Sequence, residues 1–444
     1  MDALLERLYS MKKQEIEACA KHLMLGGGTR PAPTVLRGQG VWLEDIQGKK
    51  YIDCTSQSWA MYLGFANAEL NRTVSEHANS ISHVHQGFDT PSRFALAKKL
   101  CDLAPKKINR VSFTVGGAAA VEGAMKIAVK NRENAQEFIC LYDAYHGTSL
   151  GVLGSNWAST RATGKFIGGA RFNRLTRQFI RVPNPYCYRC PLGLEKDSCG
   201  MMCLKILRLT IQKGVNGPVA GILMEPLQAS GGQIIFPKEY HQGVRGICDE
   251  YGIPLIWDEI QTYCRIGSWF ASGYYGVEPD MICLGKGLGA GYPIAATLIS
   301  DELEGFSPDT EELHTFANNT ISQVAALKQI EMLENGILDN CNRMGNYLGE
   351  ELRKMQERYP CLGDVRQAGL HIGVELVKDP VSKEADEKLL ARVRSFCMDH
   401  GVLFGVGGIL KNVLKIKPPF IINRAEADTV LNVLAEALAV VSTQ

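Results

Sequence analysis

The sequence lacks a surplus of charge of either sign. Lys and Arg number 48 and Asp and Glu number 47, so the 444-residue chain carries a formal net charge of +1. Proteins that bind nucleic acid or anionic membranes generally gather basic residues into a stripe or patch, and the sequence has no such stripe. It therefore predicts no nucleic-acid partner and no membrane-surface partner.

Long hydrophobic runs are also missing. No uninterrupted apolar stretch reaches the roughly 18 residues of a membrane span. In the N-terminal stretch MDALLERLYSMKKQEIEACAKHLM, acidic residues separate the apolar ones, so it lacks the core of a secretory signal. Its apolar spacing predicts an amphipathic helix over residues 1–25 instead. We expect a cytoplasmic protein.

Cysteine, by contrast, is plentiful, with 14 residues. Ten are scattered, several within apolar runs, as buried thiols in a reducing cell would be. The remaining four form a cluster whose spacing is compatible with a structural zinc ion or with disulfides: Cys187, Cys190, Cys199 and Cys203. Because the second pair is loosely spaced and no histidine accompanies the cluster, we favour free thiols in a surface insertion and expect no metal.

Hydrophobic residues make up 45% of the chain and charged residues 21%, as in ordinary soluble proteins. From about residue 70 to 300, helical patterns alternate with short, continuously apolar segments, which predicts a parallel or mostly parallel sheet buried on both faces. The expected strands are 110–114, 137–143, 219–226, 253–260 and 281–285, with helices at 119–130 and 238–251 between them. A strand pair is expected over 35–53, a long helix over 322–355 and a last helix over 425–441.

This pattern predicts an α/β protein of two parts. Residues 66–315 form a large domain, and residues 316–444 form a smaller α+β domain that the N-terminal residues 1–65 join.

In open α/β sheets, ligands bind beyond the carboxyl ends of the strands, so polar residues that end apolar strands are candidate site residues. Asp258 ends IPLIWD, where a buried carboxylate needs a positive partner; a structural salt bridge or a helix cap is the alternative. Lys286 follows MICLG, where a lysine between apolar walls can lose its proton and act as a nucleophile; an exposed loop lysine is the alternative.

Two further segments have the same placement. The stretch FTVGGAAAVEGAMKIA (113–128) passes from a strand through glycines into a helix, whose free N–H groups suit a phosphate; it also fits a plain glycine turn. In LYDAYHG, Tyr145 and His146 could stack on a planar ligand or could simply pack in a loop.

Together these four segments are more specific than any one alone. A phosphate cradle, an aromatic surface, a strand-end carboxylate and a strand-end lysine are the parts that hold pyridoxal phosphate (PLP). Asp258 and Lys286 are 28 residues apart, about one strand–helix–strand unit.

At this point the chain resembles the class III (ω-type) aminotransferases of PLP fold type I over nearly its whole length. The motifs that carry the resemblance are GQGVWLEDIQGKKYIDC, AYHG, MEPLQASGG, WDEIQT, GKGLGAGYPIAA, HTFANN and VLKIKPPF. The resemblance implies a PLP enzyme that moves an amino group between an amine or amino acid and a keto acid. It also implies a homodimer with its active site at the subunit interface.

The resemblance further implies a role for individual residues. Lys286 forms a Schiff base with PLP and moves a proton at the substrate. Asp258 pairs with the pyridinium nitrogen, and Tyr145 stacks on the ring. The remaining cofactor-binding positions are Gly117 and Ala118 (phosphate), His146, Glu225, Gln261 and, across the dimer interface, Thr315; the substrate positions are Ser58, Trp59 and Lys415.

Three departures from the family pattern stand out. The phosphate turn reads Gly116-Gly117-Ala118-Ala119, which leaves only backbone donors. The turn after Gln261 is one residue short. Lys415 replaces an arginine that often binds the substrate carboxylate, and it lacks that residue's two-pronged geometry. Racemases or epimerases, decarboxylating transaminases and phospho-lyases share this scaffold and remain alternatives, as does a catalytically idle homologue.

Overall fold

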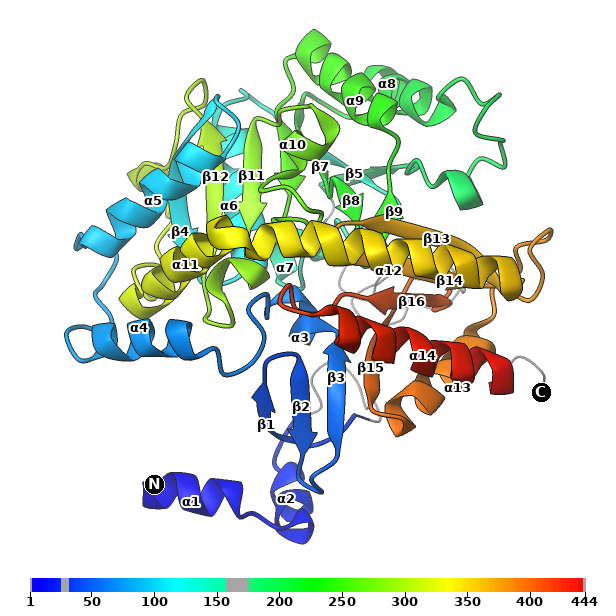
Figure 1. Cartoon of the computed structure of the whole chain (residues 1–444). Coiled ribbons are helices and arrows are strands. Elements are labelled where there is room, and N and C mark those ends of the chain that lie inside the picture. The colour runs from blue at the N-terminus through cyan, green and yellow to red at the C-terminus, as the bar shows by residue number, and fades with distance from the viewer. Residues whose placement is uncertain (1, 25–31, 157–174, 177, 442–444) are drawn as a thin grey trace.

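The computed structural model describes residues 2–24, 32–156, 175, 176 and 178–441. It contains two seven-stranded sheets, and the first, here called the upper sheet, lies in the upper half of the molecule in the cartoon (Figure 1). In spatial order its strands are β4 (Ile108–Thr114), β12 (Ala295–Ser300), β11 (Met281–Leu284), β10 (Leu255–Asp258), β7 (Val219–Met224), β5 (Glu137–Leu141) and β6 (Phe179–Val182).

The neighbouring strands from β11 through β10, β7 and β5 to β6 are parallel, and only β12 runs antiparallel to its neighbours. Every residue of β7, β10, β11 and β12 is buried, as strands covered on both faces must be. This confirms the predicted α/β architecture. Several expected strands end earlier than predicted: β5 ends at Leu141 and β7 at Met224.

Helices cover this sheet. α6 (Gly117–Lys130) packs on β7, β11 and β12, and α5 (Pro91–Leu103) packs on β4. α8 (Met202–Lys213) packs on β6 and against α9 (Lys238–Tyr251) at the top of the molecule (Figure 1). Shorter elements are α4 (Ala68–Ala78), α7 (Leu150–Leu153), α10 (Ala271–Tyr275), the pair β8 (Leu227–Gln228) and β9 (Ile234–Ile235), and 3-10 turns at Cys187–Arg189, Lys286–Gly289 and Pro308–Thr310.

The second sheet joins the two ends of the chain. Its parallel β3–β15 pair connects the N-terminal strands with the C-terminal ones. In spatial order the strands are β1 (Val35–Gln39), β2 (Trp42–Asp45), β3 (Lys50–Cys54), β15 (Val402–Gly407), β16 (Val413–Ile416), β14 (His371–Leu376) and β13 (Leu362–Ala368). α12 (Leu338–Arg358) packs on β13 and β14, α13 (Glu387–Asp399) packs on β15, and α14 (Arg424–Val441) lies against both helices.

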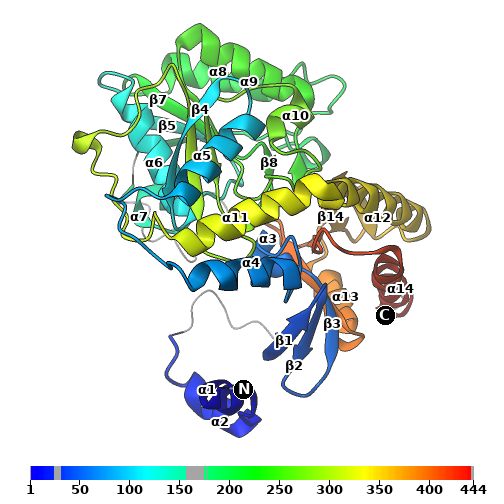
Figure 2. The same ribbon diagram turned by 60° about the vertical axis from the view of Figure 1, so that its left-hand side comes forward.

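Two expectations for the N-terminal region are wrong. Residues 35–53 form three strands and not two, because Gly40 and Gly48 each take a positive φ (58° and 81°) and turn the chain twice. The stretch 1–25 contains two short helices, α1 (Ala3–Tyr9) and α2 (Lys13–Ala20), because the backbone is extended at Lys12 between them. Neither helix has a buried residue, and both lie at the lower end of the molecule (Figure 2).

The expected single helix over 322–355 is also interrupted. α11 (Thr320–Met332) and α12 are joined by a π-helical turn, Leu333–Ile337, in which Gly336 has a φ of 105°. The long ribbon of α11 and α12 passes between the two sheets in the cartoon (Figure 1). One continuous hydrophobic core includes residues of both sheets, such as Ile282 and Leu284 from the upper sheet and Ile372 and Leu414 from the second sheet. No helix among the described residues is long and apolar enough to cross a bilayer.

Candidate active site

The start of α6 lies beside two turns that carry predicted site residues. α6 begins at Gly117 after an extended Gly116, and no side chain caps it. A Cβ built on Gly285, next to Lys286, would lie 3.5 Å from the Gly117 Cα. A Cβ on Gly147, next to His146, would lie 2.5 Å from the Ala118 Cβ. The uncapped N–H groups of a 14-residue helix therefore face the region where the two turns meet, which is a favourable place for a phosphate.

Asp258 is held at the end of β10 with both carboxylate oxygens in use. Its side chain is 4% exposed. Oδ1 accepts the Ile260 N–H at 3.1 Å, and Oδ2 lies 2.8 Å from Nδ1 of the buried His146. Since an ionised carboxylate only accepts hydrogen bonds, His146 donates from Nδ1. Its Nε2 is buried without a partner, so the pair has one ring nitrogen available to a ligand.

Lys286 follows β11, the strand paired in parallel with β10. The register sets Asp258 opposite Cys283, three residues before the lysine. Desolvation lowers the pKa of Lys286 from its ordinary value, while the negative charges of Asp258 and Glu225 oppose this. The backbone at Lys286 is left-handed, with a φ of 44°, a strained conformation that is common at functional sites. A lysine with a lowered pKa can serve as a nucleophile and as a base.

Glu225 links the remaining predicted residues. Its Oε1 accepts the Tyr145 N–H at 3.0 Å, and its Oε2 accepts the Ala229 N–H at 3.1 Å and a longer bond from Gln261 Nε2 at 3.5 Å. Burial, which His146 opposes and Asp258 reinforces, raises the pKa of Glu225 to about 7. Desolvation, with the charges of Asp258 and Glu225, also raises the pKa of Tyr145. The Gln261 Oε1 is buried without a partner.

Trp59, which follows β3 of the second sheet, lies close to Lys286. Its ring centroid lies 5.9 Å from Lys286 Nζ, 4.8 Å from Lys415 Nζ and 3.4 Å from Lys417 Nζ. Trp59 is 6% exposed, whereas the neighbouring Ser58 is exposed. The structure thus brings Trp59 and Lys415 together with Lys286.

Thr315, unlike the buried Trp59 and Lys415, is exposed. It lies in an exposed turn before α11, in the segment that follows the 3-10 turn Pro308–Thr310. This segment is fixed to the loop before α5, since Gln86 donates to the Glu312 carbonyl at 3.2 Å and accepts the His314 N–H at 2.8 Å.

Sequence reasoning missed Lys417 and Arg265. Lys417 is 3% exposed and donates to the Thr55 carbonyl at 2.8 Å. Arg265 is fully buried, donates to the Pro418 carbonyl and to Ser56 Oγ, and lies 4.9 Å from the Tyr62 ring centroid. One signal was available: Lys415 and Lys417 are two residues apart, and the period of a β-strand puts such residues on one face.

The four clustered cysteines are among the residues that line a small cavity of about 220 Å³ at the start of α8. Cys187, Cys190, Cys199 and Cys203 are partly buried and free. Among the described residues, no three His, Cys, Asp or Glu side chains are grouped so as to hold a metal ion.

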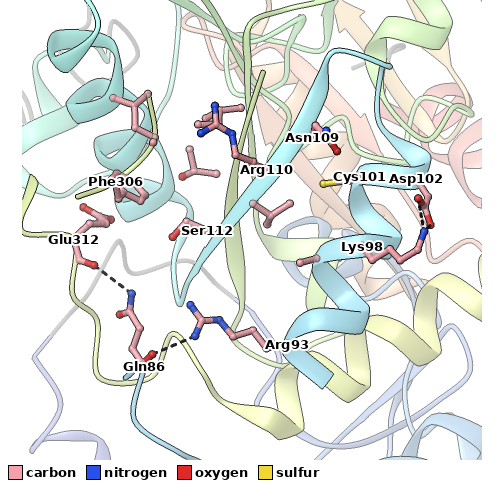
Figure 3. A pocket seen from close by; sticks show the side chains of 16 residues that line it. Gln86, Arg93, Lys98, Cys101, Asp102, Asn109, Arg110, Ser112, Phe306 and Glu312 are labelled. Carbon is pink, nitrogen blue, oxygen red and sulfur yellow. Dashed lines mark hydrogen bonds and ion pairs between the residues drawn. The ribbon is translucent and has the colours of Figure 1, made fainter. Parts of the chain in front are cut away.

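A larger cavity of about 680 Å³ is lined by residues of α5, β4 and β12 and of the loop before α11 (Figure 3). Its charged side chains have partners, such as Lys98 with Asp102 at 2.6 Å. None of the predicted site residues lines it.

The residues around Lys286 fit PLP. The uncapped start of α6 suits its phosphate, and the Asp258–His146 pair suits its ring nitrogen. The unpartnered Gln261 Oε1 and His146 Nε2 are buried polar atoms that need a partner, as a bound polar ring would provide.

Several known proteins are similar to this chain in sequence and in fold. Residues 27–438 match the profile of the family described as aminotransferase class-III. An adenosylmethionine-8-amino-7-oxononanoate aminotransferase of Geobacter sulfurreducens is 32% identical, over 92% of this chain and 92% of that protein. A leucine/methionine racemase of Thermococcus litoralis is also 32% identical, over 97% of this chain and 96% of that protein. A PLP-bound amine transaminase from an uncultivated Pseudomonas species superposes with a TM-score of 0.84 at 27% identity, over 95% and 99% of the two chains.

Proposed function

The chain belongs to the PLP-dependent class III aminotransferase family, and from this membership we propose that Lys286 is the residue through which it transfers an amino group from an amine or amino acid to a keto acid. The observation that carries the proposal is the position of Lys286, one strand away from the buried Asp258–His146 pair and beside the uncapped start of α6.

PLP, when bound, supplies an aldehyde that takes up amino groups and a ring that accepts electrons from the carbon bearing them. Lys286 binds the cofactor through its ε-amino group. Because desolvation lowers the pKa of Lys286, burial favours the neutral form of its amine, the form that can take a proton from that carbon. The same amine returns the proton at the end of the half-reaction.

Asp258 keeps a proton on the ring nitrogen, because its carboxylate is buried and His146 fixes its orientation. Backbone N–H groups of Gly117 and Ala118 hold the phosphate at the start of α6. Tyr145 and Gln261, both tied to Glu225 by hydrogen bonds, exclude water from the ring and orient it. Ser58, Trp59 and Lys415 line the substrate side.

We further propose that the active site is completed in a homodimer and that the enzyme works in the cytoplasm. The exposed position of Thr315 supports a contact with a phosphate of the partner subunit. All 14 cysteines are unpaired, which supports a reducing compartment.

A half-reaction tests the proposal. An amine donor added alone should shift the absorbance of the bound cofactor, and a keto acid added afterwards should restore it, with ping-pong kinetics overall. If no donor among α-amino acids, ω-amines and phosphorylated amines changes the absorbance, the proposal is wrong.

Racemisation is the second candidate, since the relative from Thermococcus litoralis, named a racemase, matches 97% of this chain. Single-enantiomer amino acids separate the two activities. A racemase converts one enantiomer into the other without a keto acid, whereas an aminotransferase consumes more than one equivalent of donor per bound cofactor only when an acceptor is present.

A further inference from the structure

The turn that carries Lys286 is short and has unfavourable backbone at both ends. It is the 3-10 turn Lys286–Gly289, and the backbone is left-handed at Lys286, with a φ of 44°, and again at Ala290, with a φ of 51°. Neither residue is a glycine, so neither conformation is favourable on its own. Such backbone persists only where the surrounding structure holds it. The contacts around the turn therefore decide where the side chain of Lys286 lies.

Gln329 of α11 makes hydrogen bonds that hold this turn. The residue is fully buried, and its Nε2 donates to the carbonyl of Gly287 and, at 3.3 Å, to the carbonyl of Leu288. Within the turn, the Gly287 carbonyl also accepts the Ala290 N–H at a longer 3.4 Å. One side-chain amide thus serves the two carbonyls that follow Lys286, and buried carbonyls require such a donor.

Tyr62 packs on the same turn. A Cβ built on Gly287 would overlap the Tyr62 ring, so the ring lies directly on the backbone of the turn. Tyr62 is fully buried, and its hydroxyl donates to the Tyr263 carbonyl at 2.7 Å, in the segment that follows Asp258. The turn after β11 is therefore packed against a residue that is fixed to the segment after β10, and Gln329 adds hydrogen bonds from α11.

The second polar atom of the Gln329 amide indicates why a glutamine stands here. Its Oε1 is buried without a hydrogen-bond partner among the described residues. A buried polar atom without a partner is costly, and the unbranched side chain of methionine would fill the same space without that cost. The donor end of the amide is therefore the part of the side chain that serves a purpose.

We propose that Gln329 is a positioning residue, which fixes the backbone of the turn and thereby holds the ε-amino group of Lys286 in line with the cofactor and with the substrate carbon. The inference rests on the proposed function, because that function assigns the chemistry to Lys286. A displacement of about 1 Å at a reacting group can lower a rate by about 100-fold. Loss of the amide should therefore slow the reaction far more than it weakens the binding of the amine donor.

Two variants remove the donor and keep an apolar side chain of similar size, Gln329→Met and Gln329→Leu; testing both guards against misfolding of one. L-Alanine, 4-aminobutyrate and phosphoethanolamine are each mixed with the wild-type holoenzyme, and a donor that reacts is used throughout. In single-turnover mixing we expect the maximal rate of the absorbance change to fall by about 100-fold and the donor concentration at half-maximal rate to change by less than about threefold.

Asn131 provides the matched control. It lies at the far end of α6 from Gly117 and also gives one amide to two backbone carbonyls, those of Ile127 at 2.8 Å and Glu304 at 2.9 Å. Asn131→Leu should lower the melting temperature and keep the wild-type rate. Wild-type rates in the folded Gln329 variants, or an equal loss of rate in Asn131→Leu, would overturn the proposal.

The attachment of PLP separates this failure from failure of the proposed function, since it needs no donor. PLP is added to each protein after removal of the bound cofactor, and the absorbance change that marks its link to lysine is timed. We expect slower attachment in the Gln329 variants than in wild type or Asn131→Leu. If donors react with wild type but the variants match it in both rates, the positioning role alone is wrong. If no donor reacts but attachment is slowed in the Gln329 variants, the proposed function is wrong and the positioning role remains.

Discussion

At the scale of single residues, two buried carboxylates near Lys286 have different surroundings. Asp258 is held by a histidine and a backbone N–H. Glu225 accepts two backbone N–H groups, yet burial raises its pKa to about 7. The surroundings of Glu225 therefore suit a group that changes its protonation state near neutral pH.

The Asp258→Asn substitution tests whether the negative charge of Asp258 is needed for the reaction. An amide keeps the shape but cannot stabilise a proton on the ring nitrogen, so we expect kcat to fall by about 100-fold or more while the cofactor remains bound. Asp280→Asn is the matched control, because Asp280 is ion-paired with Lys107 and Arg245 away from Lys286. It should lower the melting temperature and leave kcat near wild type. Equal loss of kcat in both variants would argue against a role for Asp258 in the chemistry.

Glu225 should also make stability depend on pH. Its folded-state pKa, about 7, lies above the ordinary value of 4.5, so the folded chain binds the proton more tightly than the unfolded chain does. The stability from this proton is fully present below about pH 4.5 and is lost as the pH rises through about 7. Urea unfolding of Glu225→Gln should show a flatter decline across this window than wild type. An unchanged slope would contradict the raised pKa.

At the scale of elements, the turn that presents Trp59 is left-handed without a glycine. Ser56, Gln57, Ser58 and Trp59 have φ angles of 43°, 44°, 65° and 70°. Such backbone costs about 1–2 kcal/mol per residue, and Asp53 offsets part of this by accepting hydrogen bonds from Thr55 and Gln57. Strain of this kind is typical of functional segments.

Replacing Asp53 with alanine should therefore release the turn. We expect the free energy of unfolding to fall by about 1–3 kcal/mol and KM to rise, because Trp59 and Lys417 lose their alignment. Asp45→Ala provides the comparison: Asp45 accepts hydrogen bonds from Gln47, Lys49 and Tyr51 in the same sheet, so its loss should destabilise the protein without changing KM. Steady-state kinetics and chemical unfolding measure both effects.

The strands and turns that carry the site residues show how much of the candidate active site could be predicted from the sequence. Asp258 and Lys286 end apolar strands, and parallel strands bring such ends together, so their proximity could be predicted. Arg265 could not, because it meets the turn that presents Trp59 only when the two sheets come together. Lys417 could be predicted only as a neighbour of Lys415, two residues further along the chain. The left-handed turn gave no signal, since its residues lack the glycines that normally mark positive φ.

At the scale of the whole molecule, exposed apolar side chains gather on two segments that are fixed to each other. Phe88 and Phe94 are 66% and 58% exposed, and Leu313 and Phe316 are 65% and 57% exposed. Asn318 donates to the Phe88 carbonyl and joins the two segments. Thr315 lies among these residues, so this surface suits the proposed dimer interface.

Phe94→Asp should disrupt that dimer. A buried, unpaired carboxylate at the interface is costly, so light scattering should give the mass of a single chain, and PLP should bind more weakly because Thr315 of the partner is lost. Val381→Asp changes an exposed apolar residue, 87% exposed, elsewhere on the chain and should leave the mass unchanged. A wild-type protein that is already monomeric and fully active would contradict the proposal.

The covalent attachment of the cofactor tests the central claim most directly. Borohydride treatment of the holoenzyme makes the link between PLP and its lysine permanent, and peptide mass spectrometry then locates the modified residue. The account predicts the modification at Lys286, with Lys415 and Lys417 unmodified although they share the same tryptophan. Modification at either of those lysines, or at none of the three, would contradict it.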